Sequence, residues 1–141
     1  MRSVISEFFK RIESGEIHAY TSALTFDEHA YRLILALIKD KYGGSPLVHL
    51  RERETALLKE FAPVFIPKLE LLSHFPNLQL IEITAHDVES MLRNILQYSL
   101  KPRDALHLSV MQRLPCFNLA SGDHHFDVAP EIKRFSVLMS S

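Results

Sequence analysis

The sequence is poor in several features that define large classes of protein. It has no Trp, four Gly and a single Cys in 141 residues, so an intramolecular disulfide is excluded and a reducing cytosol is the natural compartment. The formal net charge is −1, so a nucleic-acid partner would need a local basic patch. No apolar run approaches the ~18 residues of a membrane span, and the N-terminus lacks a signal peptide's apolar core. We therefore expect a cytoplasmic protein with no membrane partner.

The composition that is present is that of a globular protein. Apolar residues make up 47% and charged residues 23% of the chain, which is far from a disordered segment. The length suits one hydrophobic core without disulfides or structural metals. We predict a single domain over residues 1–141, with Cys116 as a small core residue.

Helix and strand patterns alternate along the first half of the chain. Apolar residues at helical spacing predict a helix that begins near Val4 and ends before Gly15. A short strand is expected at residues 17–21, followed by the clearest helix, residues 22–44, which ends in Gly-Gly. From residue 45 to about 76 we predict a helical insertion, broken into short pieces by prolines at 46, 63 and 67.

The second half continues the alternation. The pattern predicts a strand at 78–84, and a helix that starts with a capping box between Thr84 and Asp87. A further helix runs from Pro102 to about Leu114, and two short strands close the chain at residues 116–121 and 135–139. Strands that alternate with long helices predict an α/β fold with an open parallel sheet and helices on both faces.

Three carboxylates fall at predicted strand-to-helix junctions. Asp104 is in the first turn of a helix, where the helix dipole alone would stabilise it. Asp123 follows a strand and is also a routine turn former, and Asp127 could cap or ligate. Glu28 has capping-box spacing from Thr25. Together, acids at one edge of a parallel sheet suit Mg²⁺ or Mn²⁺, and such ions support phosphodiester hydrolysis.

Three stretches, "SGEIHAYTSALTFDEHAYRLI", "SLKPRDALHLSVM" and "ASGDHHFD", resemble the PIN domain family, which includes VapC-type toxins. The resemblance implies a three-layer α/β/α fold with a central parallel sheet, and a Mg²⁺- or Mn²⁺-dependent ribonuclease that cuts single-stranded RNA. Matched position by position, it implies that Glu28, Asp104 and Asp123 are catalytic and hold the metal, with Asp127 at a more variable acidic position. It also implies a homodimer and, for toxin members, an antitoxin protein.

The chain departs from the family at its start. A PIN domain opens with an apolar strand that ends in an aspartate, and nothing of that form precedes Glu7. We interpret the first residues as a helix, so the first strand is missing. Because an empty slot would leave backbone groups without partners, we expect, in order of preference, a coding sequence that begins upstream of Met1, direct pairing of the neighbouring strands, or a strand supplied by another chain.

Polar and basic residues near these acids suggest RNA contacts. Thr21 and Ser22 match a hydroxyl pair of the family, which could contact substrate or cap a helix. Lys101 and Arg103 would form a cationic rim for RNA phosphates, whereas Arg113 could equally be an ordinary solvated side chain. We expect His107 to be a hydrogen-bonded core histidine.

Two rival functions remain open at this point. The missing first acid favours a catalytically inactive PIN-like module that binds protein or RNA. The eight histidines allow a histidine-based metal-binding protein, although His124 and His125 are expected to diverge and no Cys or second His lies at zinc spacing.

Overall fold

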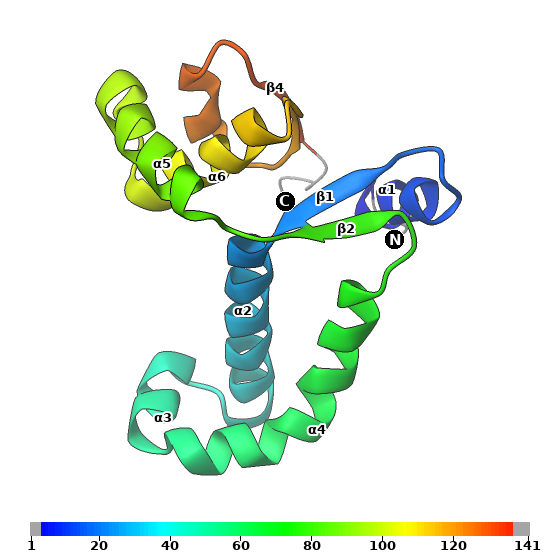
Figure 1. The fold of residues 1–141 in the computed structure, drawn as a ribbon. Helices are drawn as coiled ribbons and strands as arrows, with labels where there is room; N and C mark the ends of the chain where they lie inside the picture. Colours follow the sequence, from blue (N-terminus) through cyan, green and yellow to red (C-terminus); the bar gives the residue numbers. More distant parts are fainter. Residues whose placement is uncertain (1–3, 137–141) are drawn as a thin grey trace.

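The computed structural model describes residues 4–136 as a mixed α/β protein (Figure 1). Among these residues, no helix is both long and apolar enough to cross a membrane. The elements, in chain order, are α1 (Val4–Glu13), β1 (Ala19–Ser22), α2 (Ala23–Tyr42), α3 (Pro46–Glu52), α4 (Glu54–Ser73), β2 (Leu78–Ile81), α5 (Ala85–Tyr98), α6 (Pro102–Arg113), β3 (Asn118–Ala120), the 3-10 helix η1 (His124–Val128) and β4 (Lys133–Phe135).

The strands form two separate parallel pairs. β1 pairs with β2, with Ala19 opposite Leu78, and β3 pairs with β4, with Asn118 opposite Lys133. Within residues 4–136 these pairs are not hydrogen-bonded to each other, so neither the single central sheet nor direct pairing across the missing strand is found there. The α/β class is confirmed, but the strands have only three or four residues. Part of the predicted strand at 135–139 lies outside the described residues.

Helices α2, α3 and α4 form a projection that we call the arm. α2 extends away from the β1–β2 pair, α3 and the first part of α4 pack at its far end, and α4 then leads back to β2 (Figure 1). The arm has its own apolar core, made of Ile38, Leu50, Leu57, Phe61 and Phe65. The predicted insertion is thus helical and buries its apolar face against α2.

The prolines do not break α4, contrary to the prediction. Pro63 and Pro67 lie inside a helix of 20 residues, although each removes a backbone donor and crowds the preceding turn. Both are exposed, whereas Phe61 and Phe65 are buried. Because the prolines lie on the solvent side, packing of the aromatic stripe against α2 outweighs their local cost.

The elements that follow β2, namely α5, α6, β3, η1 and β4, form a second part that we call the head. Its apolar core is made of Leu100, Ala105, Leu108 and Ala129. Buried Asn94 of α5 joins the two helices, because its side-chain amide donates to the carbonyl of Ala105 and to Oγ of Ser109, at 3.3 and 3.0 Å. α6 begins with Pro102 in its first turn, as predicted.

The N-terminal helix is confirmed from Val4 onward, and it ends at Glu13, where Asn77 caps its last carbonyls. The side-chain amide of Asn77, beside β2, donates to the carbonyls of Ile12 and Glu13 at 2.9 and 3.3 Å. Gly15 follows at φ +87°, a left-handed conformation that favours glycine. α1 is therefore attached to the start of β2.

Asp87 connects the beginning of α5 to the end of α6. The predicted capping box with Thr84 is confirmed. The side chain of Asp87 is fully buried and accepts hydrogen bonds from Nε and Nη2 of Arg113 at 2.8 and 2.9 Å. Arg113 also donates to the carbonyl of Glu82, so the interpretation of Arg113 as an ordinary solvated side chain is wrong. This contact depends on residues 26 positions apart, which local patterns do not reveal.

Asp87 is expected to make folding stability depend on pH. Burial opposes ionisation, but hydrogen bonds from Arg113 and Thr84 outweigh it, so the pKa of Asp87 lies below its ordinary 3.8. A lowered folded-state pKa stabilises the fold above the unfolded-state pKa, and that contribution disappears as the pH falls through the folded-state pKa. We expect Asp87→Asn to lower the free energy of unfolding at neutral pH by about 2 kcal/mol, and the gap from wild type to narrow below pH 3.8.

Urea unfolding from neutral pH down to about pH 3 measures this gap. Glu89→Gln is the matched control, because it changes an exposed acid on the same helix. An equal effect of both substitutions, or a gap that does not narrow in acid, would contradict the role of Asp87.

Candidate functional site

The N-terminus of α6 presents an unpaired carboxylate. Lys101 is the N-cap residue, Pro102 follows, and Asp104 lies in the first turn. Asp104 is half-buried, and in the described part of the chain its side chain has no hydrogen-bond or ion-pair partner. The dipole of α6 stabilises a carboxylate at this position, and no described side chain competes with a cationic ligand for it.

Asp123 and His125 lie at the turn that follows β3. Asp123 is the N-cap of η1, and its Oδ1 accepts the backbone N–H of His125 at 2.9 Å and faces Nδ1 of the same residue at 2.8 Å. The rings of His124 and His125 have centroids 4.8 Å apart. The expectation that the two rings diverge is therefore wrong, because the tight 3-10 turn holds them side by side.

Asp104, Asp123 and His125 form one group, which we call the Asp-Asp-His group. One potential ligand atom from each lies within 4.8 Å of the others. Neighbouring ligands on an octahedral ion are about 3 Å apart, and opposite ones about 4.2 Å, for a metal–ligand distance of about 2.1 Å. Small side-chain rotations would therefore bring all three onto one ion. His125 was not among the predicted ligands, although the consecutive residues Asp123, His124 and His125 are a pattern that could have indicated it.

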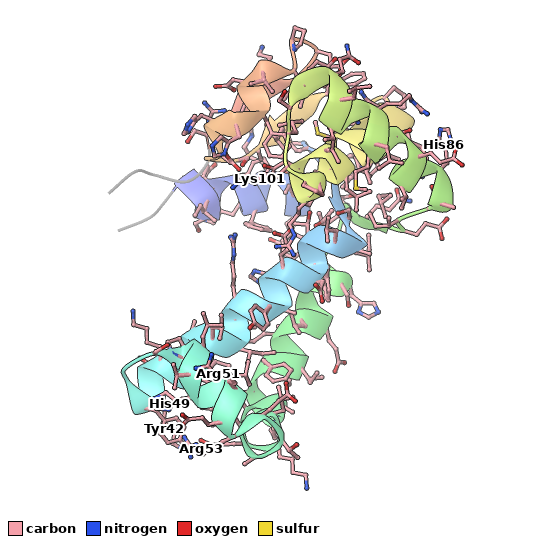
Figure 2. The ribbon with its side chains drawn as sticks, turned by 90° about the vertical axis from the view of Figure 1, so that its left-hand side faces the viewer. Tyr42, His49, Arg51, Arg53, His86 and Lys101 are labelled. Carbon is pink, nitrogen blue, oxygen red and sulfur yellow. The ribbon has the colours of Figure 1, made fainter. Side chains whose placement is uncertain are left out.

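A surface hollow of about 610 Å³ surrounds this group. Its lining residues are Lys101, Pro102, Arg103, Asp104, Asp123 and His125. Lys101 lies in the head, away from Tyr42 and Arg53 at the tip of the arm (Figure 2). The hollow is thus lined by two acids and by two cationic side chains.

Hydrogen bonds lower the pKa of Asp123 and of Asp127. The backbone N–H of His125 lowers the pKa of Asp123 below its ordinary value, against the effect of desolvation, and the His125 and His124 rings act in the same direction. Asp127 has a lowered pKa because Arg134 donates to it. Both oxygens of Asp127 are used by Arg134, at 2.9 and 3.2 Å, and Asp127 lies outside the Asp-Asp-His group.

Glu28 contacts α6 through both carboxylate oxygens. Nε2 of His107 donates to Oε1 at 2.9 Å, and Nη1 of Arg103 lies 3.5 Å from Oε2. The expected hydrogen bonding of His107 is confirmed. Glu28 is not part of the Asp-Asp-His group. Of the three predicted acids, the structure therefore brings Asp104 and Asp123 together, whereas Glu28 contacts His107 and Arg103 of α6.

The start of α2 is capped by Ser22, which was one of the two roles expected for this hydroxyl, and not by a capping box between Thr25 and Glu28. The side chain of Ser22 accepts the backbone N–H of Thr25 at 3.1 Å. Glu28 lies one turn further on, so a capping box between Thr25 and Glu28 is wrong. Ser22 is buried at the end of β1, directly after Thr21, and capping accounts for its hydroxyl.

Glu28 is expected to act through the position of α6. Glu28→Gln should lower the free energy of unfolding by about 1 kcal/mol, since a charged hydrogen bond to His107 is lost. It should change the affinity for Mn²⁺ much less than Asp104→Asn does. Calorimetric titration with Mn²⁺ and urea unfolding measure the two effects.

Asp27→Asn is the control, because Asp27 is the exposed neighbour of Glu28. If Glu28→Gln abolished Mn²⁺ binding as completely as Asp104→Asn while leaving stability at the level of Asp27→Asn, Glu28 would be a metal ligand and not a positioning residue.

Comparisons with known proteins give no match, whether with family models, with curated proteins or with solved structures. The resemblance to PIN domains therefore depends on the motif residues of this chain, and a functional assignment depends on the geometry of the Asp-Asp-His group.

Proposed function

We propose that this protein is a Mg²⁺- or Mn²⁺-dependent ribonuclease that hydrolyses phosphodiester bonds of single-stranded RNA. The observation that carries the proposal is the convergence of Asp104 and Asp123. These acids come from the start of α6 and from the turn after β3, and their carboxylates reach one hollow. Two acids 19 positions apart in the sequence that meet around the same space are a typical arrangement for binding a divalent cation.

The donor set fits a hard divalent cation. Carboxylate oxygens are preferred ligands of Mg²⁺ and Mn²⁺, and Asp104 has no partner in the described residues that would compete for its charge. When bound, such a cation lowers the pKa of a water molecule and stabilises the negative charge of a phosphate undergoing in-line displacement. Asp104 and Asp123 would hold it.

The other residues around the hollow bind and orient the substrate in this proposal. Lys101 and Arg103 attract phosphates at the rim. Glu28 and His107 keep Arg103 and the first turns of α6 in place, because the contacts of Glu28 join α2 to this helix. Asp127 acts indirectly, through Arg134, which also donates to the carbonyl of Ser121 just before the site.

A three-layer PIN-like fold is part of the proposal. Both strand pairs are parallel, as the strands of such a sheet would be. The central sheet of such a fold is not seen in the described residues, because the two pairs have no hydrogen bonds between them.

Purified protein is expected to cut single-stranded RNA when Mn²⁺ is added and to stop when EDTA is added. Asp104→Asn should lower the cleavage rate by about 100-fold or more, since it removes a charged metal ligand without changing the shape of the side chain. A fluorescently quenched RNA oligonucleotide measures the rate.

Asp40→Asn is the control, because Asp40 is an exposed acid at the far end of α2. Undiminished cleavage by Asp104→Asn would trace the activity to a contaminant or to another site, and the ribonuclease proposal would be wrong.

A second candidate function is favoured by an apolar stripe on α5. Val88, Leu92 and Leu96 recur every four residues and are 44, 60 and 87% exposed, which is unusual for a surface without a partner. This stripe supports protein binding with a second copy of this chain as the partner, which is the activity that a catalytically inactive PIN-like module would retain.

Leu96→Glu is expected to convert a homodimer to a monomer, because it places a charge in the centre of an apolar contact. Light scattering after size-exclusion chromatography measures the mass. Leu71→Glu is the control, since Leu71 is a similarly exposed leucine on α4. A wild-type protein that stays monomeric at high concentration would contradict dimerisation through α5.

A further inference from the structure

We propose that His125 is the third ligand of the metal and makes the site prefer a first-row transition ion such as Mn²⁺ to Mg²⁺. This inference rests on the metal site of the proposed function and specifies the kind of ion that the site takes. It is separable from RNA cleavage, because metal binding is measured without RNA.

The position of His125 is that of a ligand next to Asp123. Its Nδ1 lies 2.8 Å from Oδ1 of Asp123, a hydrogen-bond distance. If Nδ1 lost its proton to an ion, the two atoms would be close to the roughly 3 Å that separates neighbouring ligands of one octahedral ion. One ligand atom from each of Asp104, Asp123 and His125 lies within 4.8 Å of those of the other two. The His125 side chain is 57% exposed, so turning its ring toward an ion in the hollow would cost the contacts with Asp123 and His124 but little buried packing.

The chemistry of the donor set gives the preference. Imidazole nitrogen adds affinity for first-row transition ions, least of all for Mn²⁺, whereas Mg²⁺ takes oxygen ligands and retains several waters. Two carboxylates and a neutral imidazole balance the charge of a divalent ion. His125 would therefore supply the third protein donor of the site.

The site does not match a structural zinc site. Such sites have four Cys or His donors in a closed tetrahedron, whereas this group has one nitrogen and two carboxylates beside an open hollow. His124 lies beside His125 but is not part of the Asp-Asp-His group. His124 is therefore a matched control that tests whether one particular imidazole matters.

The experiment uses the full chain and Mn²⁺ alone as the probe. Electron paramagnetic resonance of free Mn²⁺ gives the affinity, and the electron spin-echo modulation spectrum of bound Mn²⁺ reports a directly attached nitrogen. Wild type and His124→Ala should both show nitrogen modulation. His125→Ala should lose it and bind Mn²⁺ about tenfold more weakly or worse, while Mg²⁺ affinity, measured by competition, stays within about twofold.

Several outcomes would overturn the inference. One is a wild-type spectrum without nitrogen modulation, which would mean that His125 only donates to Asp123. Another is an unchanged ratio of Mn²⁺ to Mg²⁺ affinity in His125→Ala, and a third is equal loss in His124→Ala. A His125→Gln variant, checked by circular dichroism, repeats the test with a polar side chain of similar reach. Nitrogen modulation without any RNA cleavage would contradict the proposed ribonuclease and leave ligation by His125 standing.

Discussion

The placement of α6 is the constraint on which the candidate site depends. Three polar contacts fix this helix along its length: Glu28 of α2 binds its first half through His107, Asn94 of α5 binds its middle, and Asp87 binds its end through Arg113. The three partner residues lie at the start of α2, in the middle of α5 and at the start of α5. These contacts hold the N-terminal turn of α6, which carries Asp104, close to the turn after β3.

The acids around α6 differ in what satisfies them. Asp87 is fully buried and accepts from Arg113 and Thr84, and Glu28 uses both of its oxygens on α6. These two carboxylates are used to hold helices together. Asp104 is half-buried and unpaired in the described residues, although cationic side chains are nearby. Asp104 lies in the first turn of α6, where the helix dipole stabilises a carboxylate, and it is the acid that the proposed function assigns to a cation.

Local signals in the sequence predicted the local parts of the structure. The capping box of Thr84 and Asp87, the helix start at Pro102 and the end of α2 near Gly43 depend on residues within one turn of each other, and all three are confirmed. The prolines of α4 misled because packing of Phe61 and Phe65 outweighed them. The partners of Glu28 lie more than 70 residues away, so its capping-box assignment was a local explanation of a long-range contact.

The same distinction applies to the site and to the sheet. Asp104 and Asp123 were identified as candidates because both were predicted at strand-to-helix junctions of one parallel sheet. That placement is confirmed for Asp123, which follows β3, and wrong for Asp104, because in the described chain α6 follows α5 with no strand between them. His125 was missed because its direction depends on η1, a turn of five residues with no periodic pattern. The division of the strands into two pairs was also beyond reach, since strand pairing is a tertiary property and the strands are only three or four residues long.

The most direct test of the account is anomalous X-ray diffraction from crystals of the full chain grown with Mn²⁺. The account predicts one anomalous peak in the hollow, within about 2.1 to 2.4 Å of a carboxylate oxygen of Asp104, a carboxylate oxygen of Asp123 and a ring nitrogen of His125. A well-diffracting crystal with no peak between these three side chains, or with a peak only elsewhere, would contradict it.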